Sequence, residues 1–316
     1  MRKIYDSIED IVGHTPLLRL NKLRQHFGTE ADILAKCEFY NPIFSVKDRV
    51  ALNMINKAPF SKINKDTIFI EATSGNTGAA LAAFCAVRGY RLIIVMPENM
   101  TAEKIALIRQ FGAEVMLTPA VDGMAGAIKK VEILKERSQN IIEFKQFENP
   151  ANVEAHKLTT ADEILEDTDG AVDAVVCGVG TSGTLTGVAT TLRTVNPDLY
   201  VMAVEPAESP VLSGGTEGTH RIGGIGAGFV PPLYEASLVN EVFPVSTHNA
   251  FEMTRTVARL EGLPAGVSAS AALCGAIDLA QRKEMSGKNI VVILPDSVER
   301  YLSDTFYKYK EPMEDL

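Results

Sequence analysis

Lys47 lies where a protein could use an amine to bind a carbonyl compound. It occurs in the segment NPIFSVKDRVALNMI at 41–55, which predicts a helix that starts near Lys47 with Ser45 as its N-cap. The apolar side of that helix is expected to contain Ala51, Leu52, Met54 and Ile55. The positive end of a helix dipole disfavours an ammonium ion, so a lysine at this position can act as a Schiff-base nucleophile. The alternative is a solvated lysine paired with Asp48 or another acid.

A second segment, TIFIEATSGNTGAALAAF at 67–84, predicts a strand, a polar loop and a helix. Free backbone amides at a helix start can bind an anion, and a substrate carboxylate would fit there. The loop adds hydroxyl donors from Thr73, Ser74 and Thr77, and the side-chain amide of Asn76 could hydrogen-bond a ring oxygen of a cofactor. The other interpretation is a capped helix entry that binds no ligand.

The segment VDAVVCGVGTSGTLTGV at 172–188 repeats the order of strand, turn and helix. It contains the pattern G-x-G-x-x-G at Gly178, Gly180 and Gly183. The backbone amides of this turn could hold a phosphate, with further hydroxyl donors from Thr181, Ser182 and Thr184. Glu205 ends a later strand about 20 residues further on, where a dinucleotide-binding fold places an acid for the ribose. By itself this segment therefore also fits a nicotinamide cofactor.

A fourth segment, NIVVILPDSVERYLSD at 289–304, runs from an apolar strand into two polar residues. Ligands of open α/β sheets gather at the carboxyl ends of the strands, so Asp296 and Ser297 are candidates for contact with a cofactor ring. A serine hydroxyl beside a pyridine nitrogen leaves it neutral, whereas a carboxylate would keep it protonated. Either side chain could instead only cap the short helix that follows.

Short apolar runs that alternate with amphipathic stretches are expected to position these segments. The runs predict strands at 33–38, 67–71, 91–96, 114–118, 173–177, 200–205 and 289–294. The stretches between them predict helices at 77–88, 102–112, 122–138, 154–166, 184–194, 248–261 and 268–283. This alternation predicts an α/β fold of two doubly wound domains with mainly parallel sheets.

Two breaks in this pattern suggest a domain boundary. Asn-Pro pairs occur in YNPIF at 40–44 and in NPAN at 149–152. They delimit roughly a hundred residues, so we expect a smaller mobile α/β domain at 45–150, and a larger cofactor-binding α/β domain made of 1–44 and 151–316.

Composition excludes several classes of protein. The net charge of −9 provides no excess of basic residues for nucleic acid or an anionic membrane, and no stretch approaches the ~18 apolar residues of a membrane span. The histidines show no metal-ligand spacing, so no metal is expected. The four cysteines are far apart, and the first residues, MRKIYDSIED, contain no apolar signal core. We therefore expect a cytoplasmic protein with free thiols.

Together these segments resemble the cysteine synthase and cystathionine β-synthase family of pyridoxal-phosphate enzymes. The resemblance covers nearly the whole chain, through IVGHTPLLRLN, NPIFSVKDR, EATSGNTG, KQFENPAN, GVGTSGTLTG, GGIGAGFVP and LPDSVERYLS. It implies the tryptophan synthase β-like fold and the cofactor pyridoxal 5'-phosphate. The joint order and spacing of these motifs favour this family over a nicotinamide enzyme.

The resemblance also implies roles for particular residues. Lys47 would be the Schiff-base lysine and the catalytic base, Asn76 would bond the 3′-oxygen of the cofactor, and Ser297 would face the pyridine nitrogen. The phosphate would be held by Gly180, Thr181, Ser182, Gly183 and Thr184. The substrate carboxylate would be bound by Thr73, Ser74, Gly75, Asn76 and Thr77 with Gln146, and Gly226 would line the entrance.

The implied reaction is replacement of the β-substituent of an O-activated serine, with conversion of O-acetyl-L-serine and sulfide to L-cysteine and acetate as the leading hypothesis. PDSVERYLS resembles cystathionine β-synthases more than cysteine synthases, which leaves homocysteine or cysteine open as the thiol, including a cysteine-consuming reaction that releases sulfide. Eliminative deamination of serine or threonine and a nicotinamide-dependent oxidoreductase are more distant alternatives. The family further implies a homodimer and, by analogy, the C-terminal peptide of a serine acetyltransferase as a candidate partner.

Overall fold

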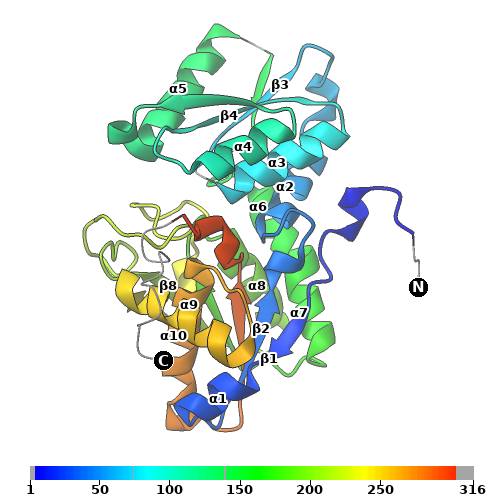
Figure 1. Cartoon of the computed structure of the whole chain (residues 1–316). Helices are drawn as coiled ribbons and strands as arrows, with labels where there is room; N and C mark the ends of the chain where they lie inside the picture. Colours follow the sequence, from blue (N-terminus) through cyan, green and yellow to red (C-terminus); the bar gives the residue numbers. More distant parts are fainter. Residues whose placement is uncertain (1–3, 74, 139, 304–316) are drawn as a thin grey trace, which may run out of the picture.

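The computed structural model describes residues 4–73, 75–138 and 140–303. These residues form two sheets, which lie one above the other in Figure 1. In the larger sheet the strand order is β1-β2-β10-β7-β8-β9, and neighbours are parallel except for β1 and β2. Its strands are β1 (Leu17–Arg19), β2 (Asp32–Cys37), β7 (Ala174–Gly178), β8 (Tyr200–Pro206), β9 (Glu241–Val245) and β10 (Asn289–Leu294).

The smaller sheet has the order β5-β4-β3-β6 and is parallel throughout. Its strands are β3 (Ile68–Ala72), β4 (Arg91–Pro97), β5 (Glu114–Thr118) and β6 (Ile141–Glu143). Side chains alternate between its two faces, so that Phe69 and Ile94 pack on one side while Ile70 and Val95 pack on the other. Both faces are apolar because helices cover both, which explains why these strands read as continuous apolar runs.

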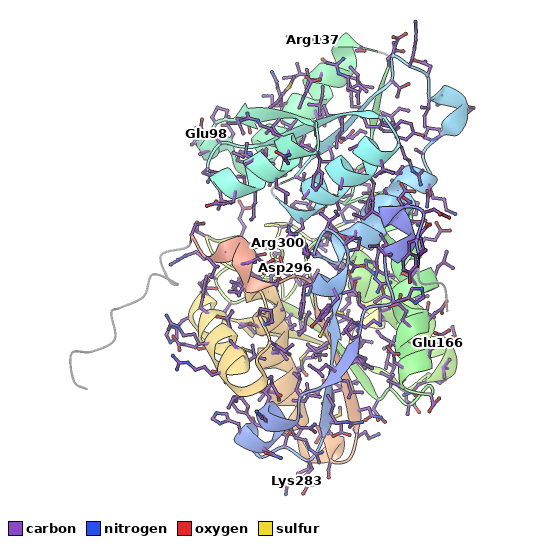
Figure 2. The ribbon with its side chains drawn as sticks, turned by 45° about the vertical axis from the view of Figure 1, so that its right-hand side comes forward. Glu98, Arg137, Glu166, Lys283, Asp296 and Arg300 are labelled. Atoms are coloured by element: carbon purple, nitrogen blue, oxygen red, sulfur yellow. The ribbon has the colours of Figure 1, made fainter. Side chains whose placement is uncertain are left out.

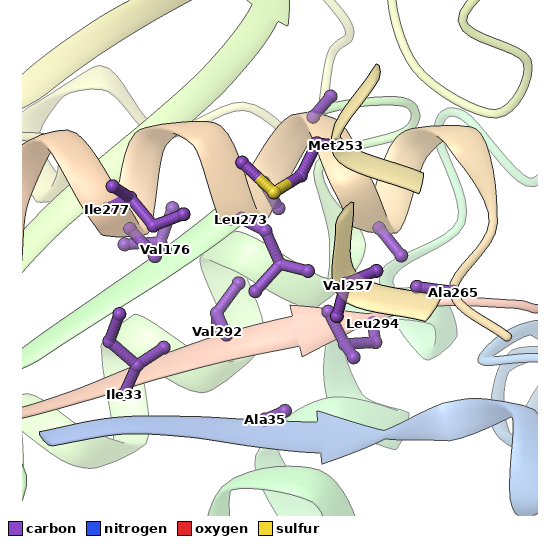
Figure 3. Packing of buried hydrophobic residues seen from close by; sticks show 14 of the residues in the cluster. Ile33, Ala35, Val176, Met253, Val257, Ala265, Leu273, Ile277, Val292 and Leu294 are labelled. Carbon is purple, nitrogen blue, oxygen red and sulfur yellow. The ribbon is translucent and has the colours of Figure 1, made fainter. Parts of the chain in front are cut away.

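Helices also cover both faces of the larger sheet. One face packs against α1 (Asn21–Phe27), α9 (Thr247–Glu261) and α10 (Val267–Ala280), and the other against α7 (Ala161–Asp167) and α8 (Gly183–Val195). Figure 3 shows the first of these interfaces, where Leu273 and Ile277 of α10 pack over Val292 and Val176. These buried contacts hold the carboxyl ends of β7 and β10 in place beside each other.

The smaller sheet has α2 (Lys47–Asn56), α3 (Asn76–Val87) and α4 (Ala102–Gln110) on one face and α5 (Gly123–Arg137) on the other. In Figure 1 α2 and α6 (Pro150–Ala155) lie where the two units meet. The lysine singled out in the sequence is therefore the first residue of a helix at this junction.

The predicted α/β class with mainly parallel sheets is confirmed, and each of the seven expected strands is present within one or two residues of its expected ends. Three strands were missed. β1 and β6 have only three residues each, and β9 is an edge strand that contains Pro244. Such short or proline-containing strands carry too little periodicity to be recognised from sequence.

Two details of the helix predictions were wrong. The N-cap of α2 is Val46 and not Ser45, because Ser45 forms a β-bridge with Asp296; its hydroxyl still accepts a hydrogen bond from the Lys47 amide at 3.2 Å. The expected helix 154–166 is interrupted by a π-helical turn, His156–Thr160, between α6 and α7. π-Turns often mark functional sites.

The smaller sheet and α2–α5 fall within the predicted range 45–150, while the strands of the larger sheet come from both flanks. The exact domain boundaries stay a prediction. Among the helices of the described residues, none has the length and apolar character needed to cross a membrane.

Candidate active site

A cavity of about 930 Å³ lies between the two units and contains Lys47 on its wall. The other walls come from the loop after β3, the glycine turn after β7, and the segment 217–229. The cavity thus lies at the carboxyl ends of parallel strands of both sheets, where α/β folds bind ligands. Of the predicted residues, those that line it are Lys47, Thr73, Gly75, Asn76, Thr77, Gln146, Gly180, Thr181, Ser182, Thr184 and Gly226. Ser74 lies outside the described residues.

The amine of Lys47 is prepared for nucleophilic chemistry by its surroundings. Burial lowers its pKa to about 8, and the carboxylate of Asp296 opposes this effect without cancelling it. The main cause is therefore desolvation, which disfavours the ammonium form. A lysine with this pKa has a substantial neutral fraction near neutral pH.

The loop after β3 is held in shape by buried polar side chains. Thr77 donates a hydrogen bond to the Gln146 side chain at 2.7 Å, and Gln146 in turn donates to the carbonyl of Ala72 at 3.2 Å. The carboxylate of Glu71 accepts from the backbone amides of Lys145 and Gln146, at 2.8 and 3.2 Å. Gln146, predicted to act with this loop, is thus in direct contact with it.

The glycine turn after β7 leaves no room for side chains at two positions. A Cβ atom on Gly180 would overlap the carbonyl oxygen of Gly224, and one on Gly183 would overlap the side chain of Asn152. Asn152 itself donates to the Thr181 hydroxyl and to the carbonyl of Gln146, each at 2.9 Å. It thus joins this turn to Gln146, which contacts the loop after β3. The turn leads into the amino end of α8, whose free amides suit a phosphate.

Matches to known proteins agree with this geometry. Residues 8–296 match the family model described as "Pyridoxal-phosphate dependent enzyme". A cysteine synthase of Staphylococcus aureus is 44% identical over 98% of this chain and 99% of its own length. The crystal structure of the cysteine synthase of Entamoeba histolytica has a TM-score of 0.94 and 43% identity, covering 99% of this chain and 93% of that one. A hydrogen sulfide-producing enzyme of Fusobacterium nucleatum has a TM-score of 0.90 and 41% identity, covering 95% of this chain and all of the other.

The chain belongs to the cysteine synthase family of pyridoxal-phosphate dependent enzymes. Its cofactor is pyridoxal 5'-phosphate, and it has the tryptophan synthase β-like fold of β-replacement enzymes. The nicotinamide alternative is overturned. Glu205, its proposed ribose-binding acid, accepts hydrogen bonds from the amides of Leu212 and Ser213 and is not among the residues that line the cavity.

The cavity of this pyridoxal-phosphate enzyme fits the cofactor. The glycine turn has amides and three hydroxyl side chains that could hold the phosphate, and Lys47 has an amine that could react with the aldehyde. Because Gly180 has no side chain, the backbone of Gly224 can approach it closely, and the amides of the turn are not covered by a side chain at this position. Within the described part of the chain, no group of three or more His, Cys, Asp or Glu side chains is placed to hold a metal ion.

One assigned position does not fit the geometry. Ser297 is buried and pairs with Ala265 in an isolated β-bridge, and it does not line the cavity. Ser268, in the first turn of α10, does line the cavity next to residues of β7 and β10. The placement favours Ser268 over Ser297 as the hydroxyl facing the pyridine nitrogen. In the sequence its only signal is a hydroxyl residue after Gly266 at a helix start.

Asn76 lies on the wall but is also engaged by the segment after β10. Its side-chain amide donates to Asp296 at 2.7 Å, and its carbonyl oxygen accepts from Arg300 at 2.8 Å. Figure 2 shows Asp296 and Arg300 near the junction of the two units. Because an amide has two N–H donors, Asn76 can keep its bond to Asp296 and still donate to a cofactor oxygen.

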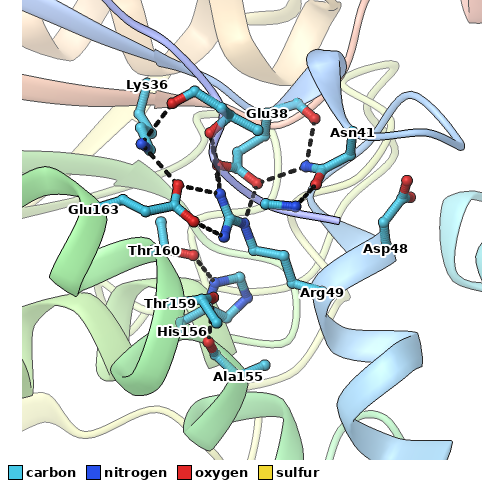
Figure 4. A network of polar contacts seen from close by, with 12 residues as sticks. Lys36, Glu38, Asn41, Asp48, Arg49, Ala155, His156, Thr159, Thr160 and Glu163 are labelled. Carbon is cyan, nitrogen blue, oxygen red and sulfur yellow. Dashed lines mark hydrogen bonds and ion pairs between the residues drawn. The ribbon is translucent and has the colours of Figure 1, made fainter. Parts of the chain in front are cut away.

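A buried ionic cluster, not recognised from the sequence, fixes the helix that carries Lys47 (Figure 4). Arg49 contacts Glu38 at 2.7 Å and Glu163 at 2.6 Å, and Lys36 contacts Glu163 at 2.9 Å. Burial opposes ionisation of Glu163, but hydrogen bonds and charge from Arg49 and Lys36 lower its pKa to about 2. The cluster ties α2 to β2 and α7 two residues beyond Lys47.

His156 was also not recognised from the sequence as a residue of the site. It is fully buried at the start of the π-turn, and its two ring nitrogens lie 2.9 Å from the Thr160 hydroxyl and 3.1 Å from the Thr184 hydroxyl. Burial, aided by the positive charges of Lys47 and Arg49, lowers its pKa well below the usual value. A neutral His156 therefore orients Thr184 of the glycine turn.

Proposed function

We propose that the enzyme converts O-acetyl-L-serine and sulfide to L-cysteine and acetate. The observation that carries this proposal is the position of Lys47, a lysine with a lowered pKa on the cavity wall between the loop 73–77 and the glycine turn. The identity to cysteine synthases over nearly the full chain supports the choice of substrates.

The roles of the chain's own residues follow from their positions. Bound pyridoxal phosphate supplies an electron sink for negative charge on the substrate α-carbon. The turn Gly180–Thr184 anchors the phosphate, and Asn76 with Ser268 orients the ring. The loop 73–77 and Gln146 bind the substrate carboxylate through neutral donors. These contacts place the α-hydrogen near Lys47, whose neutral ε-amine removes it.

The reaction balances without an oxidant or a metal. Acetate leaves with the electron pair of the Cβ–O bond, sulfide forms a bond from sulfur to Cβ, and Lys47 returns the proton to the α-carbon. We propose that the unit at 45–150 closes over the substrate, which would exclude water from this cavity.

A second candidate is the same chemistry with an amino-acid thiol, or with cysteine as donor and sulfide as product. It is supported by the segment PDSVERYLS and by the similarity to a hydrogen sulfide-producing enzyme. With an amino-acid thiol the two candidates differ only in the nucleophile. With cysteine as donor they also differ in the leaving group, which is sulfide instead of acetate.

Both proposals can be tested on the purified holoenzyme. Borohydride reduction followed by peptide mass spectrometry should find a pyridoxyl adduct on Lys47, and Lys47→Ala should lose it. An adduct on another lysine would overturn the assignment. With O-acetylserine and equal concentrations of sulfide, homocysteine and cysteine, we expect cysteine formation from sulfide to dominate; a dominant thioether product would select the second candidate.

The assembly and location of the enzyme are also proposals. We propose a homodimer in the cytoplasm, and the C-terminal peptide of a serine acetyltransferase as a ligand of the same cavity. The free thiols of Cys37, Cys85, Cys177 and Cys274 support a reducing compartment. Light scattering of the pure protein would test the homodimer. Titration with the peptide, followed by the cofactor's absorbance, would test the peptide ligand.

A further inference from the structure

Lys104 is a second lysine on the wall of the cavity. It lies in the first turn of α4, and its side chain is half-buried. Its ammonium nitrogen is 5.2 Å from the centre of the Tyr301 ring, a cation–π distance. A Cβ atom on Gly75 would lie 3.6 Å from the same nitrogen. The ammonium group of Lys104 therefore lies beside the loop expected to bind the substrate carboxylate.

Lys104 forms no ion pair with a carboxylate of the described residues. Burial lowers its pKa, Asp296 raises it and Arg300 lowers it further. Asp296 is not in direct contact with Lys104. Its Oδ2 accepts from Asn76 at 2.7 Å and from Tyr301 at 2.6 Å, and its Oδ1 is buried without a hydrogen-bond partner among the described residues. A partly desolvated cation on the wall of a ligand cavity, with no ion-pair partner among the described residues, indicates a site for an anionic group of a ligand.

The loop itself provides no positive charge. Its donors on the cavity wall are the hydroxyl of Thr73, the amides of the α3 start and the side-chain amide of Gln146, because the hydroxyl of Thr77 already donates to Gln146. Lys47 is assigned to the cofactor and to proton transfer, for which its amine must be neutral. A carboxylate that enters this enclosed site loses hydration and gains most from a nearby cation.

We propose that Lys104 binds the carboxylate of an amino-acid substrate in this cavity. The inference rests on the proposed β-replacement function and adds to it a residue that determines substrate affinity. The carboxylate has two sources, the serine-derived donor bound at the loop 73–77 and an amino-acid thiol that attacks it. The position beside Gly75 is compatible with either, and the experiment separates them.

The test compares Lys104→Met, Lys104→Arg and Lys129→Met holoenzymes. Lys129 is an exposed lysine of α5 that does not line the cavity. Lys129→Met therefore changes the net charge as much as Lys104→Met does, but away from the cavity. Affinity is measured by titrating the cofactor's absorbance with L-serine and with serinol, which replaces the carboxylate by an alcohol. The nucleophile is tested by the KM for homocysteine and for sulfide at saturating O-acetylserine.

If the donor carboxylate is bound, Lys104→Met weakens L-serine binding about tenfold, which corresponds to ~1.4 kcal/mol, and leaves serinol unchanged. If the thiol carboxylate is bound, the KM for homocysteine rises by a similar factor and the KM for sulfide does not. In both cases Lys104→Arg keeps most of the affinity and Lys129→Met has no effect.

Unchanged L-serine binding together with an unchanged KM for homocysteine would overturn the proposal, as would an equal loss for serine and serinol. Failure of the proposed function gives a different result. Wild-type enzyme would then form neither cysteine nor a thioether from O-acetylserine, while the serine titration would still report on Lys104.

Discussion

Replacing Arg49 by methionine should destabilise the enzyme strongly, because Arg49 is the centre of the buried ionic cluster. Its guanidinium donates to both carboxylate oxygens of Glu38 and of Glu163 and to the hydroxyl of Thr15, at 2.6–3.0 Å. The side chains of Arg49 and Glu38 are 1% and 0% exposed. Methionine fills a similar volume but leaves Glu38 charged and unpaired, or forces it to take up a proton.

Removing one partner of a buried ion pair costs about 3–5 kcal/mol, whereas an exposed pair contributes about 0–1 kcal/mol. The chain offers a matched control in the exposed pair Lys57–Glu154, whose side chains are 52% and 36% exposed. Lys57→Met removes the same charge from the same helix region.

The assay is urea unfolding of the two variants and the wild-type holoenzyme, followed by circular dichroism. Arg49→Met should lower the unfolding midpoint by several times the shift caused by Lys57→Met. Since α2 also carries Lys47, borohydride trapping should be slower in Arg49→Met alone. Equal shifts in the two variants would refute the reasoning that this cluster, rather than general surface charge, stabilises the junction.

Three further predictions follow from single sites. The pKa of Glu163 in the folded enzyme is about 2, below its unfolded value near 4.5, so its contribution to stability is complete above about pH 4.5 and is lost as the pH falls toward 2. Glu163→Gln should therefore flatten the plot of unfolding free energy against pH between these values. Identical acid-side slopes for the two proteins would contradict this. Gly180→Ala should weaken pyridoxal-phosphate binding about tenfold or more, since overpacking costs ~1–3 kcal/mol and the added Cβ would meet the carbonyl of Gly224. Absorbance titration of the apoenzyme with the cofactor measures this affinity. An unchanged affinity would disprove the assignment of this turn to the phosphate. Ser268→Ala should shift the cofactor's absorbance and lower kcat about fivefold, which corresponds to a lost hydrogen bond of ~1 kcal/mol, while Ser297→Ala should do neither. The reverse result would restore Ser297.

Much of the fold was predictable because its signals are local. Buried parallel strands appear as short apolar runs, and the glycine turns mark where strands meet helices, so the motifs around Lys47, Asn76 and Gly180 could be assigned to the ends of elements. Since parallel strands end at one edge, these motifs were expected to converge, and the structure brings them to one cavity.

The side-chain network was not predictable in the same way. Arg49, Glu38 and Glu163 are separated by up to 125 residues in the sequence, and each alone has the pattern of an ordinary surface charge. Only the tertiary structure brings the three side chains together and removes them from water, which makes pairing obligatory.

The sequence alone determined the lysine at a helix start, the two polar, glycine-containing turns and the alternation of strands and helices, because each depends on neighbouring residues and on backbone geometry. The tertiary structure decided which hydroxyl of the two candidate serines reaches the cavity, how far burial lowers the pKa of Lys47, and that Lys104 lies beside the same loop. These depend on the direction of side chains and on the loss of solvent around them, which arise when segments far apart in the chain are packed together.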